Sequence, residues 1–312
     1  GGSFHLFFDP EQAGVKELLA QLKRVEPQNI FLGNGSDEAI DLLMRIFCIA
    51  GQDAIITLPP TYGMYKVSAS LNAIKNIEIP LDENYQPNVA AVLAAQNERT
   101  KILFICSPNN PTVNDVDLKK IEALIQGFEG IVVVDEAYIH FSAQASCVQW
   151  IGKYPNLVVL QTFSKAWGLA GIRLGMAFAS KEIVEVLNKV KPPYNVNQLT
   201  QNAALEALQN VARYENERNV ILEQRGFLSE ELKAFSFVEK VHPSDANFLL
   251  IKVAVCRITS FSKRFFQGEN FNRLRSSILT PRNSFSESSL KKSSGDLSRI
   301  YSSIKYFVPI LA

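Results

Sequence analysis

The chain has 312 residues, 47% of them hydrophobic, with 32 basic and 31 acidic side chains; this suits one large and one small domain and gives no general attraction to nucleic acid. Its longest apolar runs, about half a dozen residues, are too short to span a membrane, and no signal-peptide pattern is visible, so we expect a cytoplasmic protein. Four widely spaced cysteines and three scattered histidines predict free thiols and no metal site.

Helical and strand patterns alternate along most of the chain. Apolar spacing predicts helices near 11–24 and 37–49 and a long helix from about 197 to 234. Short apolar runs bounded by turn residues predict strands near 54–58, 74–79, 101–105, 131–134, 157–161 and 174–179. This alternation favours an α/β fold with a mostly parallel sheet covered on both faces.

A glycine-rich turn precedes the second predicted helix. Two glycines, Gly33 and Gly35, lead into Ser36 and Asp37, after which the amphipathic pattern begins. The unpaired amides and the positive dipole end at the start of such a helix favour an anion. An ordinary glycine turn with a helix cap has the same pattern, so both interpretations stay open.

Three more segments carry polar or aromatic side chains beside predicted strands. Tyr62 stands in a turn rich in proline and glycine, and is either a ring-stacking platform or a core aromatic. Asn110 lies in a proline-bracketed turn after strand 101–105. Strand 131–134 ends on Asp135, followed by Tyr138, and open α/β sheets place ligand-binding groups at such strand ends.

Lys165 follows strand 157–161 in a loop that also carries Thr162 and Ser164. A lysine taken out of water is costly while it is charged, so its pKa falls, and an uncharged amine can condense with a carbonyl such as that of pyridoxal 5'-phosphate (PLP). Arg173 can clamp a phosphate and would lower the lysine pKa further. The alternative is a surface lysine in a turn.

Six motifs occur in one order along the chain, at 33–38, 60–65, 107–112, 135–138, 164–166 with 171–175, and 245–249. On these residues the chain, from about 27 to about 252, resembles the fold type I PLP-dependent aminotransferases and, within them, the histidinol-phosphate aminotransferases. The resemblance implies a mostly parallel seven-stranded sheet between helices and a degraded small α+β domain. It also implies an N-terminal segment at 1–25, a PLP-binding large domain at 26–234 and a small domain at 235–312.

The resemblance further implies roles for individual residues. Lys165 would bind PLP covalently and later move the proton, and Asp135 would pair with the pyridine nitrogen. The other implied cofactor contacts are Tyr138 and Asn110 on the phenolic oxygen, Tyr62 on the ring face, and Ser36, Asp37, Thr162, Ser164 and Arg173 on the phosphate.

The implied reaction moves an amino group between glutamate and imidazole-acetol phosphate, giving histidinol phosphate and 2-oxoglutarate, as a step of histidine biosynthesis. The implied assembly is a homodimer whose subunits build each site together, and the partners are small amino and oxo acids. Two alternatives stay open: another class I/II aminotransferase or a threonine-phosphate decarboxylase, and a catalytically impaired chain that binds PLP without turnover.

The chain departs from the family pattern at its start and in one turn. No methionine begins it, so we expect the family's N-terminal arm to be missing, and Phe7 or Phe8 stands where the family has a tyrosine that reaches the partner's cofactor phosphate. Val113 replaces the glycine of an Asn-Pro-Thr-Gly turn. A β-branched residue suits a positive φ poorly, so we expect strain there if the turn is retained.

The resemblance stops after about residue 253. Residues 254–312 hold 13 serines, ten basic residues and three acidic ones, a local charge of +7. Without clean periodicity this composition predicts loop or disorder and suggests a frame-shifted or spliced end. Arg257 is a candidate for the arginine that binds the substrate's acid group, although it follows Asn247 by only ten residues. A nucleic-acid or membrane patch is less favoured, because no helical basic face is present.

Overall fold

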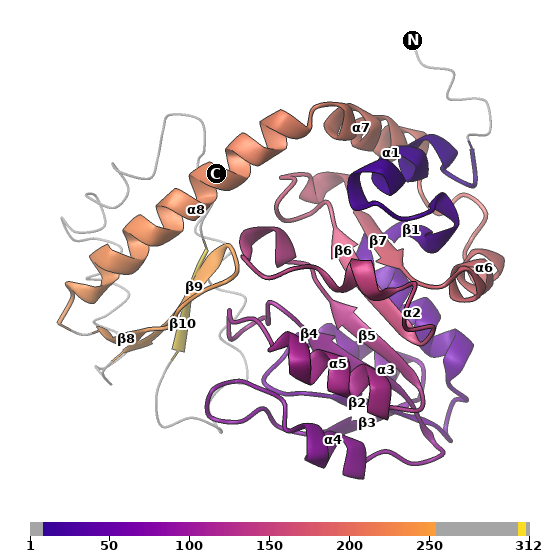
Figure 1. The fold of residues 1–312 in the computed structure, drawn as a ribbon, viewed down its shortest axis with the longest axis horizontal. Helices are drawn as coiled ribbons and strands as arrows, with labels where there is room; N and C mark the ends of the chain where they lie inside the picture. Colours follow the sequence, from indigo (N-terminus) through magenta and orange to yellow (C-terminus); the bar gives the residue numbers. More distant parts are fainter. Residues whose placement is uncertain (1–8, 237, 254–304, 310–312) are drawn as a thin grey trace. The chain divides into compact units, whose positions relative to one another are not determined.

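The computed structural model describes residues 9–236 and 238–253 and the backbone of 305–309. These residues fall into two compact units (Figure 1). The first unit contains residues 9–222 and 243–247. The second unit contains residues 223–242, 248–253 and 305–309. The domain boundaries expected from the sequence, at 25 and 234, stay predictions.

The first unit is built on a seven-stranded sheet with the order β1-β7-β6-β5-β4-β2-β3. Its strands are β1 (Ile30–Asn34), β2 (Ala54–Thr57), β3 (Lys75–Glu78), β4 (Thr100–Cys106), β5 (Ile131–Asp135), β6 (Leu157–Thr162) and β7 (Leu174–Phe178). Strands β2 to β6 pair in parallel, and β7 is antiparallel to both of its neighbours, β6 and β1. The mostly parallel α/β sheet expected from the sequence is therefore confirmed.

Helices lie on both faces of this sheet (Figure 1). They are α1 (Ala13–Lys23), α2 (Gly35–Phe47), α3 (Met64–Leu71), α4 (Val89–Ala94), α5 (Leu118–Gly127), α6 (Lys181–Val190) and α7 (Gln198–Gln209). The short 3₁₀ helices are η1 (Pro27–Asn29), η2 (Ile139–Phe141), η3 (Cys147–Trp150) and η4 (Ala170–Ile172). One core cluster joins Leu43 of α2, Tyr65 of α3 and Leu187 of α6 to the sheet residues Phe104 and Val133. Strands β2, β4, β5, β6 and β7 are buried and read as short, mostly apolar runs, which is why they were visible in the sequence.

Strand β1 was not among the strands expected from periodicity. Its five residues, Ile30–Asn34, run directly into α2, and its last two are a glycine and an asparagine. The apolar part is thus only three residues long, too short a pattern to predict a strand. It forms because β7 offers an open edge, along which residues 30–34 pair in antiparallel register with 174–178.

The prediction of one long helix from about 197 to 234 is wrong in one respect, because this segment forms two helices. Helix α7 ends at Gln209 and α8 (Val211–Lys233) begins after Asn210, which has φ −125° and ψ 53°. An asparagine side chain competes with the backbone for hydrogen bonds and so favours helix ends over helix interiors.

The second unit contains residues 223–233 of α8 and a three-stranded antiparallel sheet with the order β10-β9-β8. Its strands are β8 (Val238–Val241), β9 (Phe248–Val253) and β10 (Lys305–Pro309). A helix with an antiparallel sheet is an α+β arrangement, as expected. Strand β10 corrects the expectation that residues 254–312 hold no strand, since residues 305–309 pair with 248–252. Its isolated run of five residues gives too little alternation to predict a strand without the partner.

The turn that carries Val113 confirms the expected strain. Val113 has φ 68°, in the left-handed region, and its side chain is fully buried. Its N–H donates to the carbonyl of Asn109 at 2.7 Å, and its carbonyl accepts from the N–H of Asp245 at 2.7 Å. These bonds tie the segment 243–247 to the turn that holds Asn110. The surrounding contacts therefore hold a conformation that costs a residue with a Cβ about 1–2 kcal/mol.

This strain predicts that glycine is a less destabilising replacement for Val113 than alanine, the reverse of the usual order. Val113→Ala loses buried methyl groups but keeps the strain, so we expect it to lower the free energy of unfolding by about 2 kcal/mol. Val113→Gly loses these groups and the Cβ as well but relieves the strain, and we expect it to be the more stable variant by about 1 kcal/mol. Urea unfolding measures both. Val116, buried without a positive φ, is the control: there glycine should be the less stable replacement, and the same order at both positions would contradict the argument.

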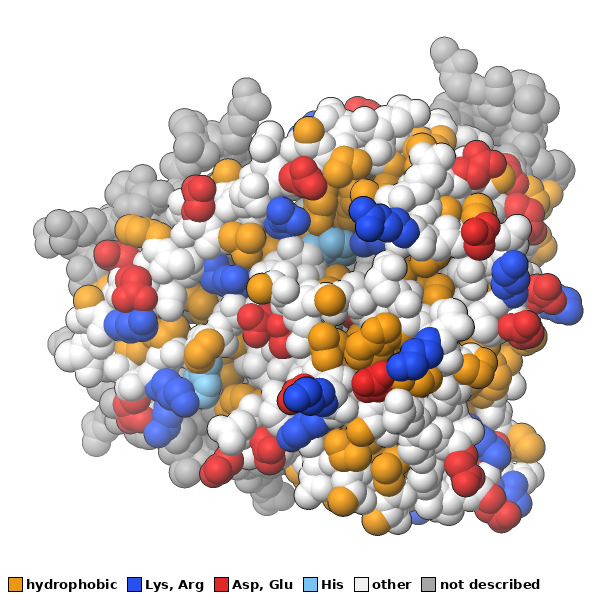
Figure 2. All heavy atoms as spheres, in the orientation of Figure 1, with side chains coloured by type: hydrophobic (Ala, Val, Ile, Leu, Met, Phe, Trp, Pro, Cys, Tyr) orange, Lys and Arg blue, Asp and Glu red, His pale blue; other side chains and the backbone are white. Residues whose placement is uncertain are grey.

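The surface of the described residues shows no strong segregation of charge on the face drawn in Figure 2. Lys and Arg side chains lie interspersed with Asp and Glu there, with hydrophobic side chains between them. Among the helices of the described part of the chain, none combines the length and the apolar character that crossing a membrane requires.

Candidate active site

All ten residues expected to contact a cofactor line one cavity of the first unit. Its volume is about 560 Å³ of non-atom space, including solvent at its mouth. The lining residues are Ser36, Asp37, Tyr62, Asn110, Asp135, Tyr138, Thr162, Ser164, Lys165 and Arg173, joined by Gly35, Cys106 and Ala137. The structure thus brings together residues that lie in separate segments of the sequence between Gly35 and Arg173.

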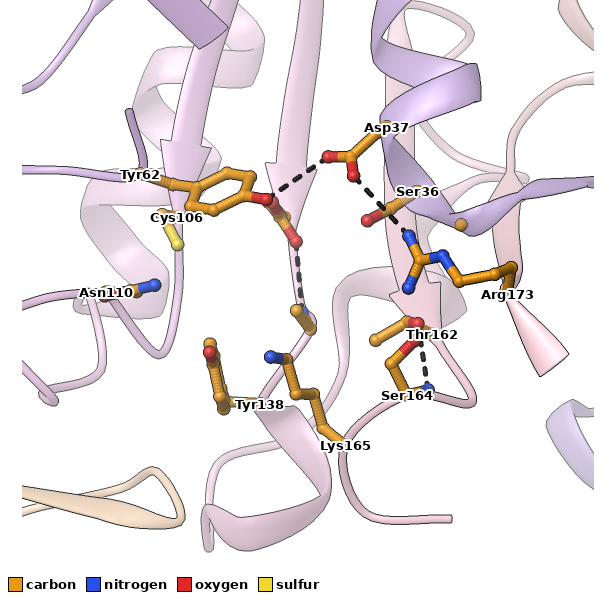
Figure 3. A pocket seen from close by; sticks show the side chains of 13 residues that line it. Ser36, Asp37, Tyr62, Cys106, Asn110, Tyr138, Thr162, Ser164, Lys165 and Arg173 are labelled. Carbon is orange, nitrogen blue, oxygen red and sulfur yellow. Dashed lines mark hydrogen bonds and ion pairs between the residues drawn. The ribbon is translucent and has the colours of Figure 1, made fainter. Parts of the chain in front are cut away.

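The topology of the sheet explains this convergence. Cys106, Asp135 and Thr162 are the last residues of β4, β5 and β6, which are parallel neighbours, so their carboxyl ends open on the same edge. Figure 3 shows Ser36, Thr162, Ser164 and Arg173 gathered on one side of the cavity, and Tyr62, Cys106 and Asn110 on the other. Lys165 and Tyr138 stand side by side between the two groups, with the lysine Nζ 5.3 Å from the centre of the tyrosine ring.

The amine of Lys165 lies in the wall of the cavity and is half-buried. Burial is the largest influence on its pKa and lowers it; Asp135 opposes this effect, and the positive charge of Arg173 adds to it. A larger fraction of this amine is therefore neutral at a given pH than in a lysine on the surface. A neutral amine can attack a carbonyl and can accept a proton.

Asp135 is buried, with 2% of its surface exposed. Its Oδ2 accepts a hydrogen bond from the Tyr65 hydroxyl at 2.7 Å, and its Oδ1 accepts one from the N–H of Ala137 at 3.1 Å. Burial raises the pKa of this carboxyl, and the bond from Tyr65 is the strongest of the effects that lower it. A buried carboxylate of this kind is stabilised by a cation placed beside it in the cavity.

Two tyrosines three residues apart occupy different environments. Tyr65 is fully buried and stacks on Phe104 at a centroid distance of 4.6 Å, so it is the core aromatic of this segment. Tyr62 is half-buried, lines the cavity and donates a hydrogen bond to Oδ1 of Asp37 at 3.3 Å. The interpretation of Tyr62 as a ring platform therefore fits its position better than the interpretation as a core residue.

The other end of the cavity is suited to an anion. Ser36 and Asp37 form the first turn of α2, whose amides have no partners within the helix. Arg173 places its guanidinium beside this turn, 3.7 Å from Oδ2 of Asp37. The hydroxyl of Thr162 accepts a hydrogen bond from the N–H of Ser164 at 3.0 Å, which fixes the start of the lysine loop. A guanidinium, hydroxyls and helix amides together form a typical site for a phosphate group.

Two glycines let the backbone segments of this anion end approach each other. A Cβ on Gly175 would lie 2.2 Å from the carbonyl carbon of Gly35 and 2.2 Å from the nitrogen of Ser36. A Cβ on Gly35, which has φ 71°, would lie 2.6 Å from the guanidinium of Arg173. Side chains at either position would fill the space in which the anion end is built.

The contact at Gly175 predicts a severe effect for Gly175→Ala. Its Cβ meets backbone atoms, which move only if the start of α2 moves, so we expect a loss of about 2 kcal/mol or more in unfolding free energy and weaker phosphate binding. Gly152→Ala is the matched control, because nothing lies within 4 Å of a Cβ added there. Urea unfolding of the two variants decides the point, and equal stabilities would contradict the argument.

The side chains of the cavity fit PLP. An aldehyde requires an amine with a lowered pKa, the ring nitrogen requires an acid partner, and the phosphate requires an anion site. Lys165, the buried carboxylate of Asp135 and the anion end at Ser36 and Arg173 provide these three features within one cavity. The individual cofactor contacts expected from the sequence remain predictions.

Sequence reasoning missed several residues of the site. Cys106 and Ala137 line the cavity without being expected to, whereas Gly35 stands in the glycine turn that was expected to favour an anion. Tyr65 was missed as the partner of Asp135, and its only signal was the spacing of three residues from Tyr62 on a helix start. The candidates Phe7, Phe8 and Arg257 lie outside the described residues.

Comparisons with known proteins agree with this geometry. The family described as "Aminotransferase class I and II" matches residues 1–265. A protein of Cytophaga hutchinsonii named histidinol-phosphate aminotransferase is 56% identical over 246 residues, which is 79% of this chain and 71% of that protein. A protein of Parabacteroides distasonis with the same name is 53% identical over 251 residues, 80% of this chain and 73% of that protein. The solved structure of histidinol-phosphate aminotransferase from Sinorhizobium meliloti, in complex with PLP, has a TM-score of 0.76 at 21% identity and covers 88% of this chain and 73% of that one.

Proposed function

The chain belongs to the family of class I and II aminotransferases, which use PLP, and on this premise we propose that it is a histidinol-phosphate aminotransferase of histidine biosynthesis. It would transfer an amino group from glutamate to imidazole-acetol phosphate and release 2-oxoglutarate. The observation that carries this choice of substrate is the identity of more than half of the aligned residues to the two curated relatives of that name.

PLP, when bound, supplies an aldehyde for the amino group and a ring that accepts electrons from the carbon to be deprotonated. The protein's part is to hold that group and to handle the proton. We assign Asp135 to the ring nitrogen, since burial disfavours the charged form of this carboxylate and a cation beside it would favour that form. We assign the phosphate to Arg173 and the first turn of α2.

Lys165 is the residue to which we assign proton transfer at its Nζ. A general base works best when its pKa lies near the working pH, and burial lowers the pKa of Lys165 in that direction. The amine accepts a proton only in its neutral form, so the rate should rise with pH through this lowered pKa. Tyr138, beside the lysine, and Asn110 would hold the phenolic oxygen of the cofactor, and Tyr62 would cover its ring.

The assembly and location belong to the same proposal. Members of the resembled family are homodimers, and we propose a homodimer in the cytoplasm for this chain. Light scattering during gel filtration tests the first part, since a molecular mass of one chain would contradict it.

Half-reactions separate the candidate activities. With glutamate, the PLP-loaded protein should lose the visible absorbance of the bound aldehyde form and release one equivalent of 2-oxoglutarate. Imidazole-acetol phosphate should then restore the absorbance, with kcat/KM at least ~100-fold above that for phenylpyruvate. No conversion would favour a catalytically impaired chain. A preference for phenylpyruvate would favour another aminotransferase, and release of CO₂ from threonine phosphate would favour the decarboxylase.

A further inference from the structure

The carboxylate of Asp135 and the ring of Tyr62 touch the same side chain. Tyr65 donates its hydroxyl hydrogen to Oδ2 of Asp135 at 2.7 Å, across 70 residues of sequence. Its ring meets that of Tyr62 edge to face, at a centroid distance of 5.5 Å and an interplanar angle of 80°. Tyr65 does not line the cavity, yet it contacts two residues that do.

The position of Tyr65 is tightly defined. It is the second residue of α3 and is fully buried, and its ring stacks on Phe104 with an interplanar angle of 17°. A side chain held by core packing in one rotamer can hold its hydroxyl in one place. The hydrogen bond therefore fixes the orientation of the Asp135 carboxylate rather than following it.

We propose that Tyr65 is a positioning residue of the cofactor site, whose hydroxyl keeps the Asp135 carboxylate ionised and oriented for a cationic ring and whose ring sets the angle of Tyr62. This inference rests on the proposed role of Asp135. It assigns a function to a core residue that does not line the cavity.

The electrostatics of the pair agree with this direction. Burial raises the pKa of Tyr65 well above its usual value, so the phenol keeps its proton and acts as the donor. Burial also raises the pKa of Asp135, and the bond from Tyr65 is the first of the effects that oppose it. The other titratable groups around Asp135 are Asp37, Tyr62, Cys106, Tyr138 and Lys165. Lys165 lowers the pKa of Asp135 and Asp37 raises it, so removal of the Tyr65 donor should raise it further.

The variant Tyr65→Phe tests the hydroxyl alone, because the ring contacts remain. Tyr154→Phe is the matched control: Tyr154 is also buried and donates to a carboxylate, Oε1 of Glu122 at 2.5 Å, but lies outside the cavity lining. Asp135→Asn and the double variant Tyr65→Phe/Asp135→Asn complete a double-mutant cycle. The measurements are the dissociation constant of PLP between pH 5 and 9 and the unfolding of the cofactor-free proteins by urea.

We expect Tyr65→Phe to weaken PLP binding about tenfold near neutral pH, since hydrogen bonds to charged groups are among the stronger ones. Protonation of Asp135 should weaken PLP binding as the pH falls, which gives the plot of affinity against pH an acid limb. In Tyr65→Phe this acid limb should move to higher pH by about one unit. In the Asp135→Asn background the same change should alter affinity by less than about twofold, and Tyr154→Phe should match the wild type.

Additive effects of the two substitutions would overturn the inference, because a merely structural tyrosine acts equally in both backgrounds. An unmoved acid limb in Tyr65→Phe, together with normal folding of the cofactor-free variant in urea, would also overturn it. These outcomes leave the proposed function intact. Failure of the wild-type chain to bind PLP at any pH would instead overturn the proposed function, and this inference with it.

Discussion

Replacement of Lys165 by alanine should lower kcat by at least ~10⁴-fold and abolish the covalent link to the cofactor. Among the described residues that line the cavity, Lys165 is the only lysine. In the proposed function its neutral form, which burial and Arg173 favour, would attack the aldehyde and carry the proton. Treatment with borohydride followed by mass measurement of the chain should show bound cofactor in the wild type and none in the variant.

Lys165→Arg separates the positive charge from the chemistry. A guanidinium keeps the charge but cannot lose its proton, so this variant should be as inactive as Lys165→Ala. Lys66→Ala is the control, because Lys66 pairs with Glu78 at 2.9 Å on the exposed surface. A reduced, covalently attached cofactor in Lys165→Ala would show that another residue is the anchor.

Replacement of Asp135 by asparagine should lower kcat by roughly 10²–10³-fold, the usual cost of removing one fixed electrostatic partner from an active site. The cofactor should also bind more weakly, because a neutral amide lacks the charge that stabilises a protonated ring nitrogen. Glu136→Gln is the matched control: Glu136 is the next residue, is equally buried and also has a raised pKa, but it does not line the cavity. Equal affinities of Asp135→Asn and the wild type for PLP would contradict the role of Asp135.

The same substitution should stabilise the fold of the cofactor-free protein or leave its stability unchanged. Burial is the main reason that the pKa of Asp135 is raised in the folded state. A raised pKa means that the folded state binds the proton more tightly, so this group stabilises the fold below its unfolded pKa and loses that contribution as the pH rises through the folded pKa. Above the unfolded pKa the burial of this carboxyl is a net cost, and cofactor-free Asp135→Asn should unfold at the same or a higher urea concentration than the wild type. A clearly lower midpoint would show that the ionised carboxylate stabilises the fold by itself.

Much of the site was predictable because its signals are local. Asp135 and Lys165 each follow a continuous apolar strand, and Ser36 begins an amphipathic helix, so each stands at a strand end or a helix start in the sequence itself. In a parallel sheet such ends meet at one edge. The pattern of elements therefore brought the candidates together before any contact was known.

Other features depend on contacts that no local pattern encodes. The bond between Tyr65 and Asp135 joins a helix to a strand 70 residues away, and only the packing of α3 on the sheet decides that these two side chains meet. The same holds for β1, which is a strand because β7 offers an edge, and for β10, which pairs with β9.

The sequence by itself determined the α/β class, six strands of the seven-stranded sheet and, together with the family resemblance, the ten cavity residues, because hydrophobic periodicity and strand-end polarity are properties of short segments. The tertiary structure alone decided the near contact of Gly175 with Gly35 and the partner of Asp135. These are set by packing between distant segments, where a few tenths of an ångström separate a contact from a clash and the residue type gives no measure of the distance.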